Sequence, residues 1–284
     1  MRWKGRRQSD NVEDRRSTTG RKVALGGGLG ALAVTLIILL LGGNPDEVMQ
    51  NLQLSPGSST QQESHPLTAE QREMGEFVSV VLADTEDVWN TLLSQNDIRY
   101  REPRLVLFTD AVNSACGFAQ AATGPFYCTG DEKVYIDLGF FRAMQRHLGA
   151  RGDFAIAYVI AHEIGHHVQN LMGIMDRVQQ QRSRLSRLEF NRLLVRLELQ
   201  ADFLAGVWAH HAQKMKNILE EGDIEEGMNA AAAVGDDRIM KRQTGMVVPD
   251  AFTHGTSEQR VRWFMKGLKS GDIRLGNTFA TDDL

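Results

Sequence analysis

From residue 67 onward, apolar residues recur mostly at helical spacing, and this pattern predicts a mainly helical domain. Thr68 and Gln71 form a capping-box signature, and apolar positions such as Phe77, Val81 and Leu92 follow, which predicts a helix over 68–95. Further helices are expected at 140–148, 153–170, 188–216, 224–234 and 257–269, the last behind a second capping box at Thr256 and Gln259. The polar, basic stretch 174–187 is expected to be an exposed helix or arm.

Two short stretches have the pattern of β-strands. Residues 103–109 (PRLVLFT) are largely apolar, and residues 133–138 (KVYIDL) alternate between apolar and polar positions. The second strand is interpreted either as an edge strand that pairs with an extended peptide, or as a simple core strand. Together with the helices, these strands predict one α+β, mainly helical domain with a small sheet over 67–284.

A long uncharged segment precedes this domain. Residues 23–41 (VALGGGLGALAVTLIILLL) contain 19 uncharged residues, close to the length of a transmembrane helix. A cleavable signal peptide is the alternative, but the preceding basic region is long and no small-x-small cleavage site follows Leu41. An uncleaved anchor is therefore favoured. Residues 42–66, rich in Ser, Gln and Pro, are expected to form a flexible linker.

Charge is distributed unevenly along the chain. The net charge is −4, but residues 1–22 carry eight Lys or Arg against three acids, so the remainder is acidic. An acidic body argues against nucleic acid as a partner. The basic segment 1–22 is expected to remain in the cytoplasm. The resulting prediction is a single-pass protein of the inner membrane with its main domain, residues 67–284, outside, in the periplasm.

Cys116 and Cys128 are the two cysteines of the chain, and both follow the membrane segment. Outside the cytoplasm two cysteines at this spacing usually pair, and the Gly124-Pro125 turn between them could bring them together. A disulfide is therefore predicted, with two buried thiols as the alternative.

The candidate chemistry lies in the predicted helix 153–170, where HEIGHH contains three histidines and a glutamate. His162 and His166 are four residues apart, so their imidazoles share a helix face and can bind one metal ion. Glu163 lies next to that face and can act on a metal-bound water. His167 is turned about 100° from His166 and is expected to be a bystander.

A zinc site needs a further protein ligand, and Glu198 in LELQADFLAG is the preferred candidate. Asp202 follows it by four residues on the same face, where its carboxylate can hold the second nitrogen of a ligating histidine. Three protein ligands leave one zinc position for water, as in catalytic sites. Other residues considered as the third ligand are Glu189, His210 and His211.

Several segments together resemble the YpfJ-type family of bacterial neutral zinc metallopeptidases, within the gluzincins. The resemblance extends over nearly the whole chain and rests on MRWKGRRQSDNVEDRR, CGFAQAATGPFYC, KVYIDLGFF, AHEIGHHVQN, ELQADFLAGVW and HGTSEQRVRWF. It implies a gluzincin-like domain with one zinc ion on His162, His166 and Glu198, and Glu163 as general base. The interval between HEIGH and Glu198 is longer than in the best-known gluzincins, which puts the local geometry in question.

The resemblance also implies a second group that stabilises the oxyanion, since a His or Arg from the C-terminal part does so in related gluzincins. His254 and Arg260 in HGTSEQR are the candidates, and His254 is preferred. Alternatively, Arg260 forms a structural ion pair with Asp236 or Asp237.

The expected function is a membrane-anchored zinc peptidase that acts on peptides or proteins. A catalytically silent zinc-binding interaction module is the alternative.

Overall fold

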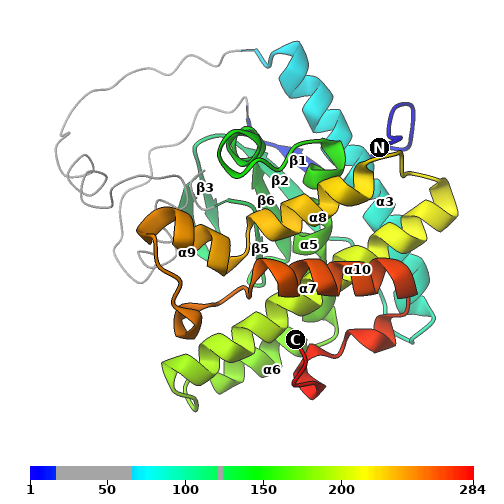
Figure 1. The fold of residues 1–284 in the computed structure, drawn as a ribbon. Coiled ribbons are helices and arrows are strands. Elements are labelled where there is room, and N and C mark those ends of the chain that lie inside the picture. Colours follow the sequence, from blue (N-terminus) through cyan, green and yellow to red (C-terminus); the bar gives the residue numbers. More distant parts are fainter. Residues whose placement is uncertain (17–65, 121–123) are drawn as a thin grey trace.

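The computed structural model describes residues 1–16, 66–120 and 124–284 (Figure 1). The predicted transmembrane segment 23–41 and nearly all of the linker 42–66 lie outside the described residues, so both remain predictions. Within the described ranges, no helix combines the length and the apolar character that crossing a membrane requires.

The described part is mainly helical with two small sheets, which confirms the α+β prediction. The helices are α3 (Ala69–Ser94), α4 (Leu138–Ala143), the π-helix Met144–Leu148, α5 (Asp153–Leu171), α6 (Ile174–Gln181), α7 (Arg187–Lys216), α8 (Asp223–Ala233), α9 (Asp236–Thr244) and α10 (Ser257–Ser270). Short 3-10 turns follow at Pro249–Ala251, Ile273–Gly276 and Thr278–Ala280. Both predicted capping boxes are present, with Thr68 and Thr256 as the caps.

Two predicted helical stretches are divided differently in the structure. Residues 174–187 do not form one arm, because α6 ends at Gln181 and Ser186 caps the start of α7 through a capping box with Glu189. The predicted helix 140–148 changes from α to π geometry at Met144. Helix α9 was not predicted, because few of its residues are apolar.

The larger sheet has four strands in the order β1-β2-β6-β5. Its strands are β1 (Val12–Asp14), β2 (Arg104–Phe108), β6 (Lys133–Asp137) and β5 (Phe126–Cys128). β1 and β6 both pair in parallel with β2, whereas β5 is antiparallel to β6. The interpretation of residues 133–138 as an edge strand is therefore wrong, since β6 lies between two strands and β5 forms the edge.

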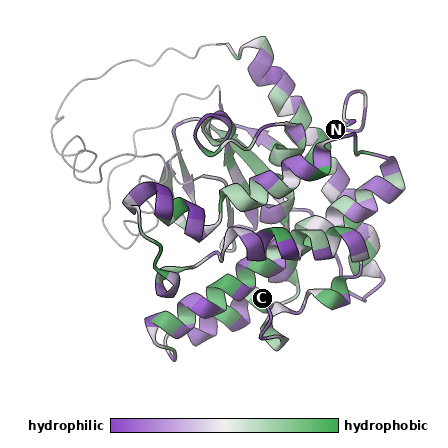
Figure 2. Cartoon of the chain, viewed as in Figure 1, coloured by the Kyte–Doolittle hydropathy of each residue, from purple (hydrophilic) through white to green (hydrophobic). Residues whose placement is uncertain are grey.

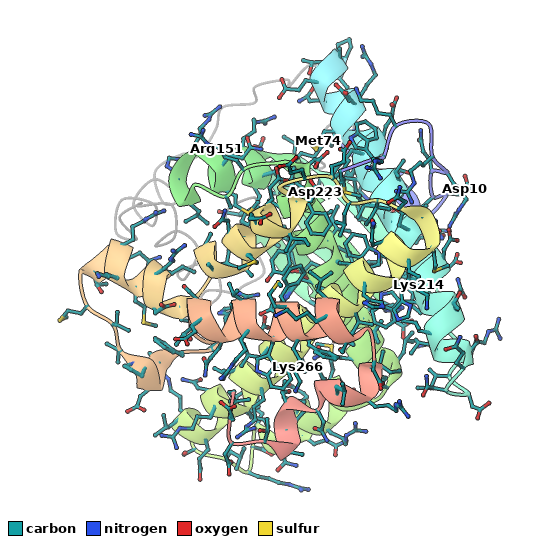
Figure 3. The ribbon with its side chains drawn as sticks, turned by 45° about the vertical axis from the view of Figure 1, so that its right-hand side comes forward. Asp10, Met74, Arg151, Lys214, Asp223 and Lys266 are labelled. Atoms are coloured by element: carbon teal, nitrogen blue, oxygen red, sulfur yellow. A yellow bond between two sulfur atoms is a disulfide. The ribbon has the colours of Figure 1, made fainter. Side chains whose placement is uncertain are left out.

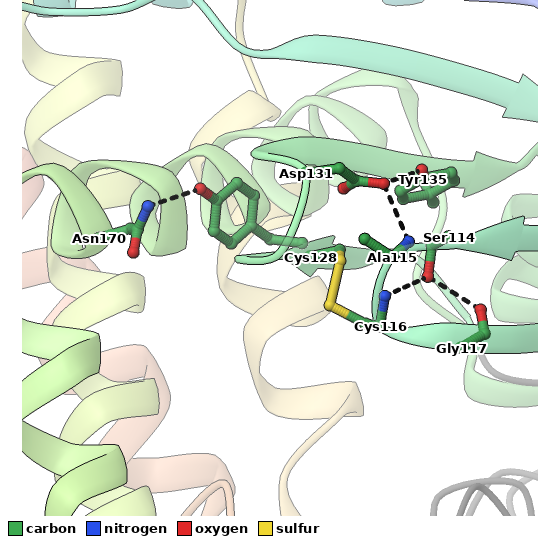
Figure 4. The surroundings of a disulfide bond; sticks show 9 residues. Ser114, Ala115, Cys116, Gly117, Cys128, Asp131, Tyr135 and Asn170 are labelled. Carbon is green, nitrogen blue, oxygen red and sulfur yellow. Dashed lines mark hydrogen bonds between the residues drawn. A yellow bond between two sulfur atoms is a disulfide. The ribbon is translucent and has the colours of Figure 1, made fainter.

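The smaller sheet is a hairpin of β3 (Ala111–Ser114) and β4 (Gly117–Gln120). A disulfide between Cys116 and Cys128 links the hairpin to β5, with a Cα–Cα distance of 5.8 Å (Figure 4). This confirms the predicted pairing. Ser114 Oγ accepts a hydrogen bond from the Cys116 amide at 3.1 Å, which fixes the turn that carries this cysteine.

The basic N-terminal segment was predicted to be separate from the domain, but its first 16 residues pack against it. β1 lies at the edge of the larger sheet, and the Trp3 ring meets Phe77 of α3 edge to face at 5.4 Å. In Figure 1 this segment, in blue, lies beside α3.

The core is centred on α5, which is surrounded by α3, α7 and α8. Its first half, FAIAYVIA, is apolar on all sides, as expected of a helix that is buried all round. The surface helices in Figure 2 carry both hydrophilic and hydrophobic bands, because each turns one polar face to water. Helices α7 and α10 cross closely at Gly206 and Gly267, where an added Cβ atom would lie 2.0 Å from a carbonyl oxygen of the facing helix. Only glycine allows this approach.

Candidate metal centre

His162, His166 and Glu198 converge in the interior of the domain. One ligand atom from each lies within 4.8 Å of those of the other two. His162 Nε2 is 3.2 Å from one oxygen of the Glu198 carboxylate, and His166 Nε2 is 3.5 Å from the other. The structure thus brings together, from α5 and α7, the three candidate ligands that the sequence indicates.

A close approach of α5 and α7 makes this convergence possible. A Cβ atom at Gly165 would lie 3.0 Å from the Ala201 carbonyl oxygen and 3.2 Å from its Cα. Gly165 lies between the two histidine ligands, and Ala201 lies three residues after Glu198. A side chain at Gly165 would separate the helices at the point where their ligands meet.

A hydrogen bond at Nδ1 fixes the orientation of each histidine ring. His162 Nδ1 is 2.8 Å from an oxygen of Asp202, and His166 Nδ1 is 2.9 Å from the side-chain oxygen of Gln169. Since both partners are acceptors, each Nδ1 carries a proton, and each Nε2 can offer its lone pair to a metal ion that displaces the proton there. Two imidazole lone pairs and a carboxylate facing one point are a donor set that suits zinc.

Asp202 belongs to a buried network behind His162. Its carboxylate accepts hydrogen bonds from Arg260 Nε at 2.8 Å and Nη2 at 3.0 Å, and from the Tyr158 hydroxyl. The expected ion pair of Arg260 therefore exists, but with Asp202 instead of Asp236 or Asp237. The guanidinium lies on the Nδ1 side of His162, away from the three converging ligand atoms.

The charges at this point attract a positive ion. Burial alone would lower the pKa of His162, but the Asp202 and Glu198 carboxylates outweigh it and raise the pKa to about 10. Burial alone would raise the pKa of Glu198, but the imidazoles of His166 and His254 outweigh it and lower the pKa well below its usual range. A metal ion would replace the proton that this field attracts.

His254 is close enough to influence Glu198, although it follows helix α9 in the chain. Its Nδ1 is 3.1 Å from Asp236, whose carboxylate also accepts the backbone amides of residues 253–255. Burial would lower the pKa of His254, but Glu198 and Asp236 outweigh it and raise the pKa. The side chain remains 35% exposed, so a bound molecule could reach it.

The other residues considered from the sequence have different positions. Glu163 is buried on α5 next to His162. His167 is turned away from the ligands and bonds the Tyr127 hydroxyl at 3.0 Å and the Arg101 carbonyl at 2.6 Å, which ties α5 to β5. Figure 4 shows a second such tie, from Asn170 to the same hydroxyl. The remaining ligand candidates have partners elsewhere: Glu189 in the α7 cap, and His210 and His211 on carbonyls at the end of α10.

Sequence reasoning missed Gln169 and Tyr158, and it considered Asp236 only as a partner of Arg260 and not of His254. Gln169 follows His166 by three residues on the same helix, and that spacing could have identified it. Tyr158 precedes His162 by four residues, so it too shares the ligand face. Asp236 carried no comparable signal, because only the fold brings it to His254.

Comparison with known proteins identifies the family of the chain. A family described as "Putative neutral zinc metallopeptidase" matches residues 1–279. The chain belongs to this family. It is 47% identical to the uncharacterized protein YpfJ of Escherichia coli (strain K12) over 286 residues, covering 98% of this chain and 99% of that protein. It is also 42% identical to an uncharacterized protein of Mycobacterium tuberculosis over 207 residues, or 69% of this chain and 68% of the relative.

The family assignment confirms the resemblance seen in the sequence, and it implies zinc and a peptide or protein substrate. No solved structure matches the chain, so the likeness to gluzincins in three dimensions stays a prediction. The residues present fit the implied metal, since two oriented imidazoles and one carboxylate meet at a single point.

Proposed function

We propose that this chain is a zinc-dependent peptidase that hydrolyses peptide bonds at the site formed by His162, His166 and Glu198. The observation that supports this most directly is the orientation of both imidazoles, whose Nδ1 atoms are held by Asp202 and Gln169 so that both Nε2 atoms face Glu198. Zinc in such a site supplies Lewis-acid activation of the scissile carbonyl and of a water molecule.

Glu163 is the proposed general base. Its carboxylate takes a proton from the attacking water and passes it to the leaving amine. Glu163 follows His162 directly on α5, so helix geometry places it beside the ligand face without making it a ligand.

His254 is the proposed donor to the oxyanion that forms during attack. Asp236 accepts from Nδ1–H, and the carboxylates of Glu198 and Asp236, which raise the pKa of the ring against the effect of burial, favour the doubly protonated form, in which Nε2–H can donate. The side chain is also partly exposed. Arg260 does not fit this role, because its guanidinium is 3% exposed and bonded to Asp202 behind His162. We assign Arg260 to positioning: it holds Asp202, which in turn holds His162.

β5 is the proposed docking strand for an extended peptide. It forms the edge of the larger sheet, and edge strands bind peptides through unpaired backbone groups. The disulfide at Cys128 and the bonds from Tyr127 to α5 fix β5 relative to the metal-binding helix.

Attachment to the cytoplasmic membrane through residues 23–41 remains part of the proposal. Its support is the apolar character of that segment in the sequence. A single crossing is not part of the proposal, because residues 1–16 contact the domain that follows the segment.

Cleavage of a peptide library by the full-length protein tests the function. We expect Glu163→Gln to lose about 10²- to 10⁴-fold in rate while still binding one zinc ion, because it removes the base and not a ligand. Glu198→Ala should lose zinc. If the wild-type protein binds zinc but cleaves no peptide under any condition, the chain is a silent zinc-binding module and the proposal fails.

A further inference from the structure

The N-terminal segment, residues 1–16, is attached to the domain along its whole length. The Arg2 amide donates to the carbonyl of Ile218, just after α7, at 2.8 Å, and the Ser9 amide donates to a carbonyl of α3 at 3.1 Å. Between residues 11 and 15 the segment pairs with β2, ending with the Arg15 amide 2.8 Å from a carbonyl of that strand. These are backbone contacts to three separate elements of the domain.

Two buried acids of α3, Asp84 and Glu86, take partners from this segment, although Asp84 also pairs with Lys216 of α7 at 2.9 Å. Asp84 is 1% exposed, and Arg6 Nη2 lies 2.6 Å from its carboxylate. Glu86 is 2% exposed, and within the described residues all donors to its carboxylate come from the N-terminal segment. They are Arg7, Ser9 and Asn11. Without the segment, Glu86 would be a buried charge without a donor, which is strongly destabilising.

A further contact connects the segment to the metal-binding helix. The Met1 ammonium lies 2.5 Å from Asp153, the first residue of α5, and 3.3 Å from both Asp223 and Glu220. Figure 3 labels Asp223, the first residue of α8. The segment therefore neutralises acids near the starts of α5 and α8 as well as those in α3.

We propose that residues 1–16 are a structural part of the domain and lie on the same side of a membrane as residues 66–284. A single crossing at residues 23–41 would place the two on opposite sides, and every contact described above would be lost. If the proposal holds, the single-pass arrangement predicted from the sequence is wrong. The basic residues at the N-terminus then serve as partners for the acids of α3, and their charge does not report a cytoplasmic location.

Labelling of introduced cysteines in the full-length protein tests the arrangement. Asp10 in the segment and Lys214 on α7 are both exposed, and Figure 3 labels both. The two natural cysteines form a disulfide, so the thiol of Asp10→Cys or Lys214→Cys is the reactive one. Intact spheroplasts that express each variant are treated with a membrane-impermeant maleimide, and permeabilised cells give the total signal. We expect both positions to be labelled or both to be protected, whereas labelling of only one overturns the proposal.

A pair of alanine variants gives a second readout. Arg6→Ala removes a partner of the buried Asp84, whereas Lys4→Ala removes an ion pair to Glu73 whose two side chains are exposed. In the full-length protein we expect Arg6→Ala to lower the melting temperature and Lys4→Ala to leave it unchanged. A segment on the opposite side of the membrane would make the two variants equally stable, and that result would also overturn the proposal.

Discussion

Replacement of Asp202 by Asn tests whether the network behind His162 supports both the fold and the metal site. Asp202 is fully buried, and its carboxylate accepts hydrogen bonds from Arg260, His162 and Tyr158. Asn has nearly the same shape but is neutral and has only one acceptor oxygen. The Asp202→Asn variant would therefore leave the buried guanidinium of Arg260 without its counter-charge.

These contacts set the expected losses of folding stability and of zinc affinity in Asp202→Asn. Loss of one partner from a buried ion pair costs about 3–5 kcal/mol. For a domain of this size each kcal/mol lowers the melting temperature by about 2–4 °C, so we expect a fall of roughly 6–20 °C. Loss of the carboxylate behind a ligating histidine lowers metal affinity by about 10- to 100-fold.

Two assays separate the effect of Asp202→Asn on folding stability from its effect on zinc affinity. Thermal unfolding in excess chelator measures the stability of the metal-free fold, and competition with a chromogenic zinc chelator measures affinity. Asp236→Asn is the matched control, because Asp236 is also a buried carboxylate but holds His254 and no ligand. We expect this control to lower the melting temperature and leave zinc affinity unchanged. Equal zinc affinity in Asp202→Asn and the wild-type protein would refute the role assigned to Asp202.

Four further predictions follow from the same contacts. His254→Gln should lower kcat by about 10²- to 10³-fold with little change in KM, because the donor acts only on the oxyanion; a change in KM alone would contradict this. Burial raises the pKa of Asp236, but His254 outweighs it and lowers the pKa below the usual 3.8. The stability that the ionised Asp236 carboxylate contributes to the folded protein is therefore complete above that pH, and it is lost as the pH falls through the folded-state pKa. The melting temperatures of the wild-type protein and Asp236→Asn should thus converge in acid. Gly206→Ala should cost about 1–3 kcal/mol in chemical denaturation, since its Cβ would meet the backbone of α10; unchanged stability would show that the helices can separate freely. Reduction of the Cys116–Cys128 disulfide, whose cysteines are 12 residues apart, should cost about 3 kcal/mol and lower the denaturation midpoint; a double Ser variant with wild-type stability would argue against this.

Features with local signals were predictable from the sequence. The two capping boxes indicated where α3 and α10 begin, because the residues that make each cap are only three positions apart. The spacings of His162 and His166, and of Glu198 and Asp202, indicated two helix faces. The structure brings these faces together, with the Asp202 carboxylate at His162 Nδ1.

Features that depend on long-range packing were not predictable. The partner of Arg260 could not be chosen among several acids, because α7 and α10 are adjacent only in the folded domain. β1 has three residues, Val12–Asp14, inside a basic stretch. Three residues are too few to show the alternation of apolar and polar positions by which a strand is recognised. The order of the sheet was missed for the same reason, since β2 and β6 pair in parallel across an intervening hairpin and β5.

The pairing of β1 with β2 has a consequence for how the chain is made. Val12 pairs with Leu105, so synthesis must continue for about ninety residues before β1 has a partner. At roughly 5–20 residues per second this interval is about 5–20 s. The apolar residues 23–41 leave the ribosome within that interval, before β2 exists. If residues 23–41 direct the nascent chain to a membrane, as the sequence predicts, that step competes with closure of the sheet. The speed of translation would then set the fraction of molecules in which the N-terminal segment pairs with β2.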